Sequence, residues 1–231
     1  MTKRTRLYVA LTIALGVALL AICLASEGAS RHSGTYLLYC VLGCVASVMK
    51  VRLPGINGTI SANFLFILIG VGLFTFAETV CLASLACVVQ CLWKSKTHPK
   101  FVQVAFNISV LAISSGASYR LAHYFSRPYE AHLSVLLAVA VSFYFTADTL
   151  LVSGVLAMLQ SKPLLTVWQQ CYLWSFPYYL VGAAIAGVML SAYRSVGLAA
   201  SLSVLPLMGL AFVFYRLCVD RVERRSPVEA Q

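Results

Sequence analysis

The chain has 231 residues, of which 61% are hydrophobic and only 10% are charged, and its formal net charge is +10. This composition leaves too little polar surface to cover a soluble domain, and it predicts an all-α, polytopic integral membrane protein. The basic residues lie at the ends of apolar runs and not in one stripe, so the positive charge indicates membrane topology and no nucleic-acid partner.

The N-terminal basic segment, residues 1–6, precedes an apolar run over 7–25. We expect this run to be a first membrane span and not a cleaved signal peptide, because it lacks a clean small-x-small cleavage site. A polar loop over 26–34 then leads to a second apolar run over 35–49, which ends at Lys50 and Arg52.

The segment 50–66 is strongly punctuated by proline and glycine, and we expect it to form a turn at the membrane surface. Thr59 and Ser61 are predicted to cap the helix that begins near Asn63. Backbone N–H groups at such a helix N-terminus, beside basic side chains, can hold a phosphate or a carboxylate. The candidate site for an anion or a lipid headgroup comprises Lys50, Arg52, Gly58, Thr59 and Ser61, with an ordinary cap in contact with lipid as the favoured interpretation.

The next apolar run, residues 61–93, would be about 50 Å long as one helix, whereas a bilayer core is about 30 Å thick. We therefore expect it to fold back as a helical hairpin, with short helices over 61–76 and 80–93. The turn is predicted near Thr75–Thr79, which places the charged Glu78 at the outer surface.

Charge counting supports the hairpin. With it, 13 of the 17 lysines and arginines face the cytoplasm, and without it the split becomes 8 inside and 9 outside, which removes the usual cytoplasmic excess. The 13 are Lys3, Arg4, Arg6, Lys50, Arg52, Lys94, Lys96, Lys100, Lys162, Arg216, Arg221, Arg224 and Arg225.

Four further apolar runs follow, over 101–124, 133–159, 172–193 and 196–217. They complete about eight membrane helices, with both termini in the cytoplasm, in a single membrane domain over 1–218 followed by a short basic cytoplasmic tail over 219–231. Aromatic residues crowd the boundary before the seventh segment, and we expect Tyr178 and Tyr179 to belong to an interfacial aromatic belt.

Asp148 lies mid-span in the run over 133–159, where an ionised carboxylate costs several kcal/mol unless it is paired or hydrated. Counted from the cytoplasmic ends of the helices, the polar residues nearest to it in depth are Asn107, Ser114 and Ser115. Two interpretations stay open: a protonated carboxyl hydrogen-bonded between helices, and a group that senses a ligand or a proton.

All eight cysteines lie in or beside apolar runs, so we expect no disulfide framework. Two pairs, Cys40/Cys44 and Cys87/Cys91, have the spacing that shares a helix face, but packing is favoured over a soft-metal site because no histidine or acid accompanies either pair. No nucleophile–base pair or metal-binding motif can be assembled. We therefore expect no catalytic residue, no cofactor and no enzymatic activity.

Several short motifs occur in a recognisable order along the chain. They are Gly58-Thr59-Ile60-Ser61, Gln90, Phe106-Asn107, residues 144–151, Trp174-Ser175-Phe176-Pro177-Tyr178-Tyr179-Leu180 and Tyr215-Arg216-Leu217. This set resembles the N-terminal membrane module of bacterial cyclic-di-GMP signalling proteins, which precedes HD-GYP or GGDEF output domains. The resemblance covers roughly residues 35–220 and implies a sensory or scaffolding module. Asp148 stands where the family pattern has asparagine, and neither output signature is present, so the family's enzymatic activities do not transfer.

The predicted function is a sensory module in the bacterial inner (plasma) membrane, spanning it several times. Its partners are the lipid bilayer and a separate cytoplasmic signalling protein. The alternative is a membrane carrier, or the substrate-binding component of a vitamin-type uptake system, because short paired helices beside a Gly/Pro-rich turn and an intramembrane acid suit such proteins as well.

Overall fold

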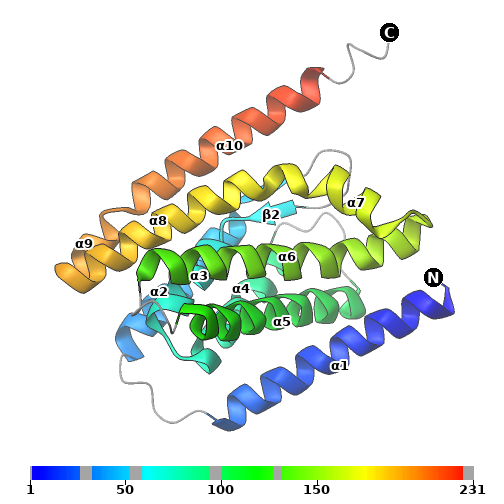
Figure 1. The fold of residues 1–231 in the computed structure, drawn as a ribbon, viewed down its shortest axis with the longest axis horizontal. Helices are drawn as coiled ribbons and strands as arrows, with labels where there is room; N and C mark the ends of the chain where they lie inside the picture. The colour runs from blue at the N-terminus through cyan, green and yellow to red at the C-terminus, as the bar shows by residue number, and fades with distance from the viewer. Residues whose placement is uncertain (1, 27–32, 53–58, 94–99, 127–131, 226–231) are drawn as a thin grey trace.

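The computed structural model describes residues 2–26, 33–52, 59–93, 100–126 and 132–225, and within them the chain is almost entirely helical (Figure 1). Its elements are α1 (Lys3–Ser26), α2 (Ser33–Val48), β1 (Lys50–Arg52), β2 (Thr59–Ser61), α3 (Phe64–Leu73), α4 (Phe76–Leu92), α5 (Phe101–Ser126), α6 (Leu133–Gln160), α7 (Leu164–Cys171), the short 3₁₀ helix η2 (Leu173–Ser175), α8 (Phe176–Ser195), α9 (Leu198–Leu202) and α10 (Leu205–Arg225).

Five helical segments among the described residues are long and apolar enough to cross a membrane. They are α1, α5, α6, α8 and the stretch Leu198–Cys218, while α2, α3 and α4 are shorter apolar helices. Large apolar side chains on α1 and α10 are exposed, as expected of surfaces that contact lipid. The helical class and its compatibility with a membrane protein are thus confirmed, and the count of eight membrane segments stays a prediction.

The apolar run over 61–93 folds back as a helical hairpin of α3 and α4, but the reversal comes earlier than expected, at Phe74 and Thr75. Thr75 caps α4: its hydroxyl accepts from the Glu78 N–H at 3.3 Å, and its own N–H donates to Glu78 Oε2 at 2.8 Å. This capping box starts a helix where the sequence analysis expected a turn. Glu78 is therefore a buried residue in the first turn of α4, 7% exposed, and its predicted place in an outer turn is wrong.

The ten-residue helix α3 is the centre of the bundle, and eight of its ten residues are buried. It packs against the longer helices α2, α4, α6 and α8. Its sequence is apolar on every side, which suits a helix that has protein all round it. At about 15 Å it is half the thickness of a bilayer core, and the strand β2 leads into it.

The punctuated segment forms a small antiparallel ladder, in which Lys50 pairs with Ser61 and Arg52 with Thr59. The prediction that Thr59 and Ser61 cap a helix is wrong, because both lie in β2. Asn63 takes the N-cap position of α3 and makes no side-chain capping hydrogen bond. Gly58 falls outside the described residues.

Helix directions can be followed from contacts near the helix ends. α2 and α4 run in the same direction, since Tyr36 OH donates to Glu78 O near their starts and Lys50 Nζ donates to Gln90 O near their ends. α8 runs parallel to α3, since Phe64 contacts Tyr178 near their starts and Arg194 Nη2, in the last turn of α8, donates to Gly72 O near the end of α3 at 3.2 Å. The start of α1 and the end of α10 lie on the same side of the bundle (Figure 1). This arrangement agrees with termini on one side of a membrane, and which side is cytoplasmic stays a prediction.

The C-terminal third differs from the expected boundaries. Residues 164–171, which lie between the apolar runs predicted over 133–159 and 172–193, form the helix α7, and α10 continues to Arg225, so the predicted tail begins inside a helix. Tyr178 and Tyr179 are buried in the core at 7% and 3% exposure, so their assignment to an interfacial belt is wrong. Pro177 lies in the first turn of α8, where proline starts a helix without kinking it.

Candidate functional site

A compact polar cluster joins β2, the start of α3 and the last turn of α4. Ser61 Oγ lies 2.7 Å from Asn63 Oδ1 and 2.9 Å from Gln90 Oε1, and it can donate to either. Asn63 Nδ2 donates to Gln90 Oε1 at 3.2 Å. Ser61 and Asn63 are almost fully buried, so these hydrogen bonds replace those that water would otherwise supply. We call Ser61, Asn63 and Gln90 the amide cluster.

Lys50 closes one end of this cluster. Its ammonium donates to the backbone carbonyl of Gln90 and, at 2.9 Å, to that of Trp93. These are carbonyls of the last turn of α4, which lack partners within the helix and attract cations. Lys50, in the strand β1, therefore caps the C-terminal end of α4.

A second group of polar atoms involves Cys91, which follows Gln90 on α4, and Cys87, which lies one turn earlier. Cys87 Sγ and Cys91 Sγ are 4.0 Å apart, and Asn107 Nδ2 of α5 donates to Cys91 Sγ at 3.5 Å. Cys87 is buried, while Cys91 is half-buried beside the end of the helix. Lys50 is close enough for its charge to act on Cys91, and Asp148 is close enough to act on Cys87.

Asp148 lies one turn of α6 after the buried Tyr144, and its side chain is half-buried. Its Oδ1 atom is enclosed by protein, and no described residue donates a hydrogen bond to it. Its charge would act on the hydroxyls of Tyr144 and Tyr179. A buried carboxyl oxygen without a partner costs about 1–3 kcal/mol, so packing alone gives no reason for an acid here.

The serines expected around Asp148 do not bind it. Ser115 Oγ donates to Ala112 O of its own helix at 3.1 Å, and Ser114 Oγ is buried without a hydrogen-bond partner. Ser153, nine residues after Tyr144 on α6 and likewise buried, also has a hydroxyl without a hydrogen-bond partner among the described residues. The helices α5 and α6 therefore carry several buried polar atoms that the described residues leave unsatisfied.

The predicted site residues are thus brought together only in part. The structure places Asn107 beside the cysteine pair and Ser61 in the amide cluster, and it joins neither to Asp148 by a hydrogen bond. Arg52 and Thr59 face one another in the backbone ladder. These contacts do not test whether an anion binds at the ladder of β1 and β2.

Asn63 was missed as a site residue, and Gln90 entered only through the family resemblance. The signal was available, since both are amides inside or at the edge of a long apolar run. An amide buried in a membrane protein needs a partner, and two amides within one predicted hairpin are obvious partners for one another.

Comparisons with protein-family models, with curated proteins and with solved structures find no match for this chain.

Proposed function

We propose that the chain is a membrane-embedded sensory module without a catalytic domain, located in the bacterial inner membrane. In this proposal a ligand binds at Asp148 of α6, and the cytoplasmic end of α10 carries the response to a separate signalling protein. The single observation that supports it most is the enclosed Oδ1 of Asp148, which has no partner among the described residues. A ligand or a proton would supply the missing interaction.

A continuous series of aromatic contacts supports a link from Asp148 to α10. Tyr144, one turn from Asp148, contacts Tyr179 with ring centroids 6.2 Å apart, and Tyr179 contacts Phe64 at 4.5 Å. Phe64 contacts Tyr178 at 5.3 Å, and Tyr178 stacks on Tyr215 of α10 at 4.2 Å. Rings packed in this way can change position together, which is the kind of element that couples distant sites.

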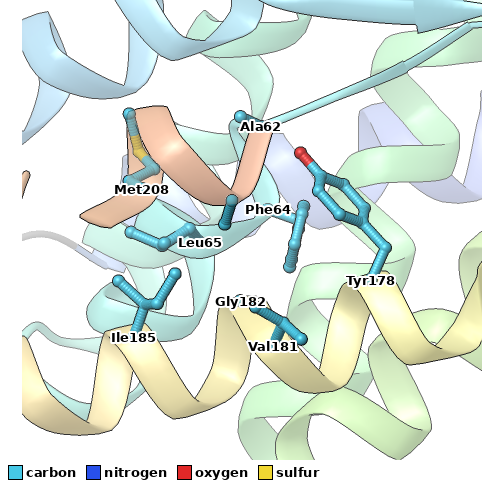
Figure 2. A pocket seen from close by; sticks show the side chains of 9 residues that line it. Ala62, Phe64, Leu65, Tyr178, Val181, Gly182, Ile185 and Met208 are labelled. Atoms are coloured by element: carbon cyan, nitrogen blue, oxygen red, sulfur yellow. The ribbon is translucent and has the colours of Figure 1, made fainter. Parts of the chain in front are cut away.

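α10 makes only limited contact with the rest of the bundle, as expected of a helix that moves to transmit a signal. Figure 2 shows Met208 of α10 above a small apolar pocket, opposite Phe64 of α3 and Gly182 of α8. α10 packs chiefly along α8, and large side chains such as Leu210 and Phe214 are exposed. A helix attached along one narrow face can shift without disrupting the core.

A ligand screen tests this proposal. Purified protein is exposed to pools of small molecules, and binding is read as a rise in unfolding free energy, about 2.7 kcal/mol at a hundredfold excess over Kd. We expect hits whose effect disappears in Asp148→Leu and persists in Thr146→Val, an exposed position on the same helix. A hit with an equal effect on both variants would place the ligand elsewhere.

The alternative, a carrier or its substrate-binding component, is favoured by one observation. The half-length α3 begins inside the bundle at the amide cluster and follows an extended segment, as do the broken helices that bind substrates in transporters. Proteoliposomes distinguish the two functions: a carrier moves a radiolabelled hit across the bilayer, whereas a sensory module binds it without net flux.

A further inference from the structure

We infer that Cys87 and Cys91 form a two-thiol site for a soft monovalent cation of the Cu(I) type. The site is independent of whether the module is a sensor or a carrier. Two cysteines four residues apart on a helix share a face, but this spacing alone is equally compatible with packing. The structure adds a direct contact, since the two sulfur atoms lie 4.0 Å apart.

The separation suits a bridging ion. Metal–sulfur bonds are about 2.3 Å long, so an ion held in a straight line between two sulfurs keeps them about 4.6 Å apart. The observed separation is shorter by roughly half an ångström, a difference that small rotations of the two side chains can supply. No group of three or more histidine, cysteine or acidic side chains is placed to hold a metal in the described part of the chain. Two-coordination is typical of soft monovalent ions and unsuited to zinc, which takes four ligands.

Near Cys91 the surroundings complement the charge of a loaded site, whereas the charge of Asp148, when ionised, opposes it at Cys87. Binding one monovalent cation releases both thiol protons, so the ion with its two thiolates carries a net charge of −1. Lys50, whose charge acts on Cys91, offsets this charge, and Asn107 Nδ2 donates to the Cys91 sulfur at 3.5 Å. Hydrogen bonds and charges of this kind orient and stabilise metal-bound thiolates.

An ion can reach the pair from the end of α4. Cys91 is half-buried and precedes the last helical residue, Leu92, whose side chain is exposed, as is Trp93. Cys87 lies one turn deeper and is 1% exposed, so the ion is shielded from water once it is bound.

The chain contains its own matched control. Cys40 and Cys44 of α2 have the same spacing in a second short apolar helix. Full-length protein is prepared with only Cys87 and Cys91 retained, and a second form with only Cys40 and Cys44 retained. Cu(I) binding is measured without oxygen, in competition with the chelator bicinchoninate.

We expect the first form to bind one Cu(I) per chain, at least about tenfold more tightly than the second, and Asn107→Leu to weaken that binding by about tenfold. Should the sixfold replacement disturb folding, single substitutions in the natural chain give the same comparison: Cys87→Ala and Cys91→Ala lose the tight binding, and Cys40→Ala retains it. Equal affinity in the two paired forms, or tight binding that survives Cys91→Ala, would overturn the assignment.

Discussion

Replacing Asp148 by leucine is predicted to stabilise the protein. Leucine preserves the branched shape of the carboxyl group, and Oδ1 of Asp148 has no hydrogen bond to lose. Removing a buried, unpaired polar atom gains about 1–3 kcal/mol, and part of this gain is offset because the methyl groups are larger than the oxygens. The expected net increase in unfolding free energy is about 1–2 kcal/mol.

The neighbouring residue provides a control of opposite sign. Thr149 is fully buried; its hydroxyl donates to Phe145 O at 2.6 Å and accepts from Trp168 Nε1 at 2.9 Å. Thr149→Val keeps the shape and leaves the indole N–H without its acceptor, which should cost about 1–3 kcal/mol.

Both variants are compared with the natural chain by reversible unfolding in mixed detergent–SDS micelles. A stability gain at Asp148 beside a loss at Thr149 fits an acid that is held available for a ligand, since functional groups are often retained at the expense of stability. Destabilisation by Asp148→Leu of more than about 1 kcal/mol would refute the reasoning, because it would show that the carboxyl group holds the fold together.

Three further predictions concern the fold and the output. Gly182→Leu should destabilise the protein by at least about 1–3 kcal/mol, because a Cβ at this position would lie 2.3 Å from the Phe64 ring. Gly209→Ala should be neutral or stabilising by up to about 1 kcal/mol, because a Cβ there would have nothing within 4 Å. Equal effects of the two substitutions in an unfolding titration would contradict the close packing of α3 on α8. Thr75→Ala should cost about 1 kcal/mol by removing the cap of α4, measured in the same way, and no change would show that the cap is dispensable. Deleting residues 219–231 should leave membrane insertion and ligand binding intact and abolish the response of the signalling partner in cells, and an unchanged response would exclude α10 as the output.

The hairpin was predictable from the length of one apolar run and from the distribution of lysine and arginine around it. An apolar run over 61–93 is too long for one upright helix, and charge counting chose the fold-back. The position of the turn was not predictable from the same argument, because it depends on which residue can cap α4. Thr75 and Glu78 are spaced as a capping box, although the only charge in an apolar run is also typical of a loop residue.

Some of the polar residues of the site could be predicted from the sequence, whereas the contacts between them could not. Depth along the helices placed Asn107 near Asp148, but depth does not fix the rotation of a helix about its axis, and Asn107 faces Cys91. Ser61 was assigned to a cap because the turn predicted over 50–66 does not by itself show that Ser61 pairs with Lys50 in a strand ladder.

The central claim, that the state of Asp148 controls α10, can be measured without knowing the ligand. Spin labels are placed at two exposed positions, Leu159 at the end of α6 and Leu217 near the end of α10, in a cysteine-free chain in lipid nanodiscs. Pulsed electron–electron double resonance then gives the distribution of distances between the two labels for the natural aspartate, for Asp148→Asn and for Asp148→Leu. The proposal predicts that Asp148→Leu shifts the mean distance or the balance of two populations by at least about 2 Å relative to the natural aspartate, the scale of helix displacements in switching proteins. Superimposable distributions in all three chains, each shown to be folded, would contradict it.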